Sequence, residues 1–252
     1  MRKRYFFFIT VTLAFTAVFT SCTDFFSTSW ARWAARDPDK LVPKVTAGNV
    51  DELIATAENN PDLSLAILKK IQAATNGASE DDKLKLQSAA LGAAANAAGL
   101  GQAVLGAAGQ LTSLSGDNSE DDIKDATDML LNAINGMKNL EASCAALCGI
   151  LPDPADQAAF DAFTAAASAN DLAMAAAMLI AGEVKNQVNN DVTPEEYLED
   201  IKNRIEQGDD LKESENLARA MALAAAIPGR ENELSGPLKD VLEGLNLLNL
   251  SL

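Results

Sequence analysis

The stretch NPDLSLAILKKIQAAT, residues 60–75, shows how this chain folds. Asn60 can accept an amide N–H at the start of a helix, and Pro61 suits the first helical position, where no N–H is needed. Leu63, Ile67 and Ile71 then recur at four-residue spacing, which places them on one face of a helix. The stretch therefore predicts an amphipathic helix whose apolar face needs a partner.

Similar helix starts recur along the chain. In each, an Asn, Ser, Asp or Thr is followed three residues later by an acidic residue, which favours the positive end of a helix. The pairs are Asn49 and Glu52, Ser79 and Asp82, Ser119 and Asp122, Asp153 and Asp156, and Thr193 and Glu196. Second helices are expected to begin at Asn60, near Gly101, near Gly136, at Asn170 and at Asp209. Good helix formers dominate past residue 48 and no sustained β-branched alternation occurs, so the sequence predicts an all-α fold.

Two helices in about every 37 to 40 residues are typical of an α-solenoid, in which helix pairs stack to bury their apolar faces. The unit resembles the tetratricopeptide repeat (TPR), whose second helix is similarly rich in small residues, although the Trp, Leu-Gly and Tyr positions of that pattern are missing. The resemblance implies an α-solenoid of about five TPR-like helix pairs in residues 49–252. The alternative is an irregular helical bundle.

A leucine stripe at the C-terminus predicts a last helix. Its residues, spaced three or four apart, are Leu238, Leu242, Leu245, Leu248 and Leu252. Such a helix either caps the open end of the stack or offers a docking face to a partner.

The first 21 residues have the pattern of a signal peptide. Three basic residues at 2–4 precede an uncharged run at 5–19, which as a helix spans about 22 Å, less than the roughly 30 Å of a bilayer core. Phe19-Thr20-Ser21-Cys22 resembles the lipobox of bacterial lipoproteins, with Phe and Ser where Leu and Gly or Ala are commoner. The resemblance implies cleavage before Cys22 and palmitate-like acyl chains on that cysteine, which tether the chain to a membrane. Simple secretion or an uncleaved anchor is the alternative.

Residues 22–48 are interpreted as a lipidated aromatic segment and linker. Thr23, rather than Asp, follows the cysteine, which in lipoproteins favours the outer membrane, on its periplasmic or surface face, over the inner membrane. If the segment is helical, Phe26, Trp30 and Trp33 share one face. These rings are expected either to lie in the membrane interface or to dock on the helical domain.

Composition excludes several classes of function. The chain carries 20 Lys+Arg against 36 Asp+Glu, a net charge of −16, which repels nucleic-acid phosphates. It contains no histidine, so the usual general base, the commonest metal ligand and every Ser-His or Cys-His nucleophile pair are absent. The chain is therefore expected not to be an enzyme and to hold no cofactor.

No metal site is predicted. In DNSEDDIKDATD, residues 117–128, Asp117, Ser119, Asp121 and Asp128 fall at EF-hand positions, but Asp122 stands where the loop needs Gly. Cys144 and Cys148 lie four apart, on one face of a helix, and are interpreted as small core residues. A disulfide between them is the alternative, although a four-residue spacing in a regular helix aligns the two Cα–Cβ bonds poorly for it.

Residues 86–116 carry no charge and include ALGAAANAAGLGQAVLGAAG at 90–109. A membrane helix is not expected there, because Asn96 and Gln102 would be unsatisfied in lipid and Gly99 and Gly101 offer a helix break. Small residues instead favour close helix packing in water.

These features predict a membrane-tethered, non-enzymatic lipoprotein. Its helical-repeat domain would act as a protein-interaction scaffold or adaptor in the bacterial cell envelope, and its acidity would favour a basic partner. One alternative is a ligand-binding accessory lipoprotein of a solute transporter, in which residues 89–109 and 165–182 line an apolar cavity. A surface-exposed adhesin or antigen is another.

Overall fold

The computed structural model describes residues 37–101, 134–187, 196, 197, 200, 204 and 214–234. The chain divides into two units, Met1–Leu41 and Val42–Leu252, which we describe separately. The described part of the first unit is one short helix, α3 (Pro38–Leu41), at whose start Asp37 Oδ1 accepts the N–H of Asp39 at 3.1 Å. The predicted signal peptide lies outside the described residues.

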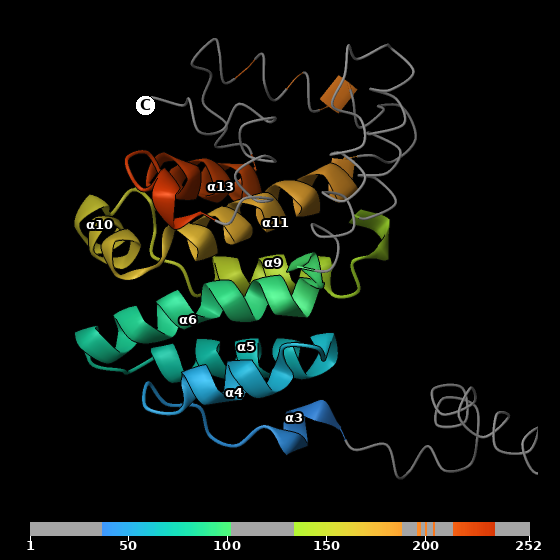
Figure 1. Cartoon of the computed structure of the whole chain (residues 1–252), viewed down its shortest axis with the longest axis vertical. Helices are drawn as coiled ribbons and strands as arrows, with labels where there is room; N and C mark the ends of the chain where they lie inside the picture. The colour runs from blue at the N-terminus through green and yellow to red at the C-terminus, as the bar shows by residue number, and fades with distance from the viewer. Residues whose placement is uncertain are drawn as a thin grey trace, which may run out of the picture. The chain divides into compact units, whose positions relative to one another are not determined.

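Every regular element among the described residues of the second unit is helical, which confirms the predicted all-α class (Figure 1). In chain order the elements are α4 (Val50–Ala57), α5 (Pro61–Thr75), α6 (Glu80–Ala98), α9 (Leu140–Cys148), α10 (Gln157–Ala166), α11 (Ala169–Gln187), α13 (Glu215–Ala225) and the 3₁₀ turn η3 (Glu231–Glu233). Val42 and Val45, from the predicted linker, lie buried in the core of this unit.

The helix starts that depend on short local bonds are confirmed. Asn60 Oδ1 accepts the N–H of Leu63 at 3.1 Å, with Pro61 as the first residue of α5. Ser79 Oγ accepts the N–H of Asp82 at 3.3 Å at the start of α6. The break predicted at Gly99 is also present: with a φ of +74° this residue ends α6, in a conformation that glycine adopts without a Cβ clash.

One predicted start is wrong. Asp153 does not cap α10: Asp156 accepts the N–H of Ala159 at 3.2 Å, whereas Asp153 accepts the N–H of Ala155 within the preceding turn. Both carboxylates can cap a helix, and the burial of Phe160 and Phe163 in the core selects the second. Asp209, where another helix is expected to begin, lies outside the described residues. The next described helix, α13, begins at Glu215 and is capped by Ser214.

Asn49 precedes α4 as predicted, but its side chain does not cap the helix. Its Oδ1 accepts hydrogen bonds from the N–H and the hydroxyl of Thr46, and its amide donates to the Lys44 carbonyl. It therefore fastens the entering loop instead. The starts predicted at Ser119 and Thr193 lie outside the described residues.

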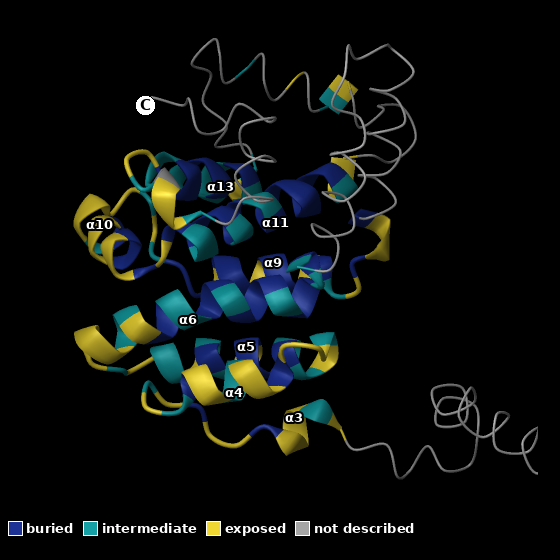
Figure 2. Ribbon diagram, in the orientation of Figure 1, coloured by how far each residue is buried: buried dark blue, intermediate teal, exposed yellow. Residues whose placement is uncertain are grey.

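Two long alanine-rich helices occupy the centre of the second unit. α6 contacts α4, α5, α9, α10 and α11, and α11 also contacts α9, α13 and η3. In the last turns of α6 five alanines are buried on successive faces, and in α11 every residue at 178–184 is buried (Figure 2). A helix buried all round must have neighbours on all sides, so α6 and α11 are the core.

These contacts differ from those of a simple stack of repeats. In the predicted solenoid, α6 is the first helix of the second pair, and α10 and α11 form the fourth pair. In the structure, however, α6 contacts both α10 and α11. In a solenoid each unit contacts only its neighbours. The described contacts of α6 therefore extend beyond those of neighbouring repeats.

A charged clamp holds the junction between α10 and α11. Arg230 donates to the carbonyls of Thr164 and Ala167, at 3.0 and 2.7 Å, and pairs with Glu233 at 2.9 Å. Glu233 Oε2 accepts the N–H of Ala169 at 3.1 Å. The positive charge of Arg230 thus lies at the C-terminal end of α10, and the negative charge of Glu233 lies at the N-terminal end of α11. Both placements are favourable for the helix dipoles.

The described ranges contain no single helix with the length and apolar character of a membrane span. Only α10 and α11 taken together meet that test, and they are bent by 117°.

We expect Gly182→Ala to lower the free energy of unfolding. A methyl group at Gly182 would lie 2.6 Å from Cys144 Sγ, and such overpacking costs about 1–3 kcal/mol, against about 1 kcal/mol gained in helix propensity. In a Cys144→Ala background the clash is gone, and the same substitution should stabilise. Urea unfolding followed by circular dichroism measures both.

Gly92→Ala in α6 is the matched control, because a Cβ there would have Asp171 Oδ1 as its nearest neighbour at an ordinary 3.9 Å. It should stabilise by about 1 kcal/mol in either background. Equal effects of Gly182→Ala in the two backgrounds would contradict the close approach of α9 and α11.

The clamp also predicts a pH dependence. The pKa of Glu233 is lowered, chiefly by its hydrogen bond from Arg230 and then by the N–H of Ala169. A lowered pKa in the folded state contributes stability at neutral pH that is lost as the pH falls through it. Glu233→Gln should therefore lower the urea midpoint at pH 7, and this difference should disappear in acid. The exposed carboxylate of Glu58, at the C-terminal end of α4, supplies the control, Glu58→Gln. A difference that persists in acid would contradict the role of the charge.

Candidate functional site

The residues singled out in the sequence as functional lie outside the described part of the chain. They are the lipidation site Cys22 and the aromatic residues Phe26, Trp30 and Trp33. The acidic stretch at 117–128 and the leucine stripe at 238–252 also lie outside it. These predictions remain predictions, and the candidate site is sought in the described helices.

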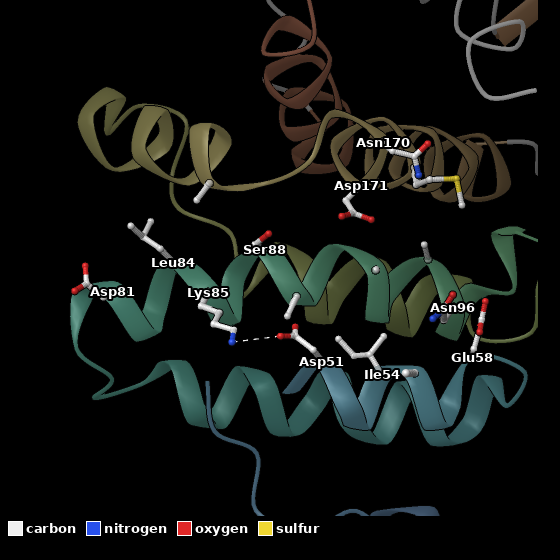
Figure 3. A pocket seen from close by; sticks show the side chains of 16 residues that line it. Asp51, Ile54, Glu58, Asp81, Leu84, Lys85, Ser88, Asn96, Asn170 and Asp171 are labelled. Carbon is white, nitrogen blue, oxygen red and sulfur yellow. Dashed lines mark ion pairs between the residues drawn. The ribbon is translucent and has the colours of Figure 1, made fainter. Parts of the chain in front are cut away.

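An open groove of about 790 Å³ runs along α6, with α4 on one side and α11 with the end of α10 on the other (Figure 3). The lining residues of α6 recur at three- and four-residue spacing, so they form one face of that helix. From α6 these are Asp81, Leu84, Lys85, Ser88, Ala89, Gly92, Ala95 and Asn96. α4 contributes Asp51, Ile54, Ala55 and Glu58, and the other wall contributes Ala166, Asn170, Asp171 and Met174.

The floor of the groove is made of small residues. Ala89, Gly92 and Ala95 follow one another at three-residue spacing along α6. Small residues leave room for another backbone to approach closely, as they do between packed helices. Ile54 and Met174 stand beside them half-buried, so apolar surface is available for contact.

The border of the groove is acidic. Its carboxylates are those of Asp51, Glu58, Asp81 and Asp171, and its one cation is Lys85, paired with Asp51 at 3.3 Å. The side chains of this pair are 48% and 72% exposed, and an exposed ion pair contributes little stability. The groove thus keeps a negative excess, and Lys85 is free to exchange partners at little cost.

Asp171 is held in place by the start of α11. Its Oδ2 accepts the hydroxyl hydrogen of Ser168 at 2.6 Å, and its own N–H donates to Ser168 Oγ at 3.1 Å. Ser168 thus caps α11 as in a capping box, but the carboxylate of Asp171 bonds to the hydroxyl of Ser168 rather than to its backbone N–H. The carboxylate is therefore a rigid part of the groove wall.

A second polar cluster is buried between α11 and α13. Glu183, 6% exposed, accepts hydrogen bonds from Gln187, Tyr197 and Asn216 at 3.1, 3.2 and 3.5 Å. Burial, followed by the charge of Glu183, raises the pKa of the Tyr197 hydroxyl. With its oxygens hydrogen-bonded, this carboxylate serves as a structural tie between elements.

The two core cysteines are free thiols, and both are buried. Cys144 Sγ donates to the Met178 carbonyl at 3.7 Å, and Cys148 Sγ to Asn216 Oδ1 at 3.6 Å. Each thiol thus contacts a different element, in keeping with their prediction as core residues. Among the described residues no group of three or more His, Cys, Asp or Glu side chains is placed to hold a metal ion.

The sequence indicated the floor of the groove but not its border. In the ligand-binding alternative, residues 89–109 and 165–182 line an apolar cavity. Of these stretches, Ala89, Gly92 and Ala166 line the open groove. Asp51 and Glu58 carry no such signal, because an acidic residue near a helix end is common. Only the packing of α4 beside α6 brings them to the same place.

Comparisons of the chain with protein-family models, with curated proteins and with solved structures gave no match. We therefore derive the function of the groove from its own geometry.

The buried thiols should not react in the folded protein. Burial raises the pKa of Cys144 to about 12 and that of Cys148 to about 11, and the thiolate is the reactive form. Iodoacetamide at pH 8 should leave both unmodified in the native protein and alkylate both in urea, as peptide mass spectrometry would show. Alkylation of Cys148 at the same rate in both states would contradict its burial.

Proposed function

We propose that this protein is a lipid-anchored adaptor of the bacterial cell envelope, whose helical domain binds another envelope protein in the groove along α6. The observation that carries the proposal is the groove itself: an apolar floor of small residues with an acidic border, formed by helices distant in sequence. Most of its lining is half-buried or exposed. Small-molecule sites usually enclose most of their ligand, so an open groove suits a macromolecular partner better.

The repeat architecture is the finer part of the proposal. It is an α-solenoid of about five TPR-like helix pairs in residues 49–252, with the leucine stripe at 238–252 as its capping helix. An extended helical surface offers more than one face to partners, which suits a scaffold.

The membrane anchor rests on the sequence pattern alone. Acyl chains on Cys22 would hold the protein at the outer membrane, and Phe26, Trp30 and Trp33 would lie in the interface or dock on the helical domain. Tethering raises the effective concentration of the groove for a partner in the same membrane, so a modest affinity suffices. An adaptor needs no reactive group, and a chain without histidine suits that role.

Crosslinking in living cells tests this function. A photoreactive amino acid in place of Ser88, on the groove face of α6, should give a discrete adduct with one envelope protein. The same amino acid in place of Ala158, exposed on α10 outside the groove, should give none. Adducts of equal yield at both positions, or none at either, would contradict the adaptor function.

The anchor is tested in the same strain. Radiolabelled palmitate should enter the wild-type chain and not the Cys22→Ala variant, in which the Ser88 adduct should weaken because the tether is lost. Unchanged palmitate incorporation in the Cys22→Ala variant would contradict the assignment of Cys22 as the acylated residue.

A further inference from the structure

We propose that the groove along α6 receives a single amphipathic α-helix of the partner, with small and apolar residues on one face and Lys or Arg along both edges of that face. This inference rests on the proposed adaptor function and specifies the chemistry of the partner segment.

The shape of the groove fits a helix. Its α6 face runs from Asp81 to Asn96, about 22 Å at 1.5 Å per residue, the length of a helix of some 15 residues. α4 lines it at positions 51, 54, 55 and 58, the repeat of one helical face. The bound segment would lie between α4 and α11 as one more helix on α6.

An extended segment is a poorer fit. Strand addition needs an exposed sheet edge with unpaired N–H and C=O groups, and the groove walls are helices whose backbone groups are bonded internally. A helix brings its own backbone bonds satisfied and presents only side chains. The groove therefore supports the helix-in-groove mode of recognition.

The floor sets how close the partner can come. Ala89, Gly92 and Ala95 leave a shallow strip, and a helix seated on it can approach to the lower end of the usual 8–10 Å between axes. Ile54, Leu84 and Met174 border the strip and are half-buried, so an apolar face on the partner would complete their burial. Met174 can adjust to different side chains because its thioether is flexible.

The charges set which residues flank that apolar face. Asp81 and Glu58 lie toward opposite ends of the groove, and Asp171 points from α11 toward α6 (Figure 3). Only Asp51, of the four carboxylates, pairs with the groove lysine. A helix with cations along its edges meets these groups, whereas an acidic helix is repelled.

The test uses three fluorescent peptides and the full-length mature protein in nanodiscs of zwitterionic lipid. The first peptide is a helix former of about 15 residues with a Leu/Ala face flanked by lysines. The second carries glutamates in place of the lysines, and the third has the first composition with a proline at its centre, which breaks the helix. Fluorescence anisotropy should show binding of the first, weakened by salt, and at least about tenfold weaker binding of the other two.

Paired variants locate the site. Glu58→Lys, at the C-cap of α4, and Glu52→Lys, in its first turn, make the same charge change at exposed positions, but only Glu58 lines the groove. Ala89→Leu fills the floor, whereas Ala158→Leu adds the same side chain outside it. We expect Glu58→Lys and Ala89→Leu each to weaken binding of the lysine peptide by about tenfold, and the two controls by less than about twofold. Circular dichroism verifies that each variant is folded.

Equal losses in Glu58→Lys and Glu52→Lys, or equal binding of the helical and proline-broken peptides, would overturn the inference. A small molecule retained in native mass spectrometry and lost from Ala89→Leu would overturn it too. If the Ser88 adduct forms in cells but no peptide binds, the adaptor function stands and the helical partner is excluded. If neither is observed, both proposals fail.

Discussion

The close packing of α6 and α11 through small side chains is the interaction on which the rest of the second unit depends. Each of the other helices described in this unit contacts at least one of the two. Alanine loses almost no side-chain entropy on folding but buries little apolar area, so such a core gains stability only by having many neighbours. Between α9 and α11, the absence of a side chain at Gly182 leaves room for the thiol of Cys144. Side-chain hydrogen bonds to backbone carbonyls add directional contacts to this packing. Gln87 donates to the Ile150 carbonyl at 3.0 Å, and Arg219 donates to the carbonyls of Leu151 and Pro152.

The same small residues account for the groove. On most sides of α6 a neighbouring helix covers the alanines, but between α4 and α11 they line an open strip instead. Large side chains at Ala89 or Gly92 would fill this strip from within. A core built from small residues therefore leaves, at its surface, a shape that another helix can complete. The link between core composition and proposed function is geometric, with no need for a reactive group.

Acidic side chains have two physical roles in the described part of the chain. Asp62 and Glu233 are held by donors, Asp62 by Asn139 and Lys138, and the pKa of each is lowered by these hydrogen bonds. They join elements of the fold. Glu58 and Asp81 instead stand exposed at the groove. In the proposed function these exposed carboxylates supply the attraction for a basic partner, while the bonded ones keep the walls in position.

The sequence by itself determined the helical class, the starts of α5 and α6, and the break at Gly99. These features depend on bonds between residues no more than four apart, such as Asn60 to Leu63, and on the backbone freedom of one glycine. Only the tertiary structure decided that Asp156 rather than Asp153 caps α10, that α6 contacts α10 and α11, and that Asp51 and Asp171 border one groove. A helix face made of alanines presents a nearly uniform surface of methyl groups, so its sequence does not specify which helix packs against it. Which helices pack together is decided by steric complementarity, as where Gly182 contacts Cys144 and where Phe160 and Phe163 are buried. These contacts join residues far apart in the sequence, so a local sequence pattern does not predict them.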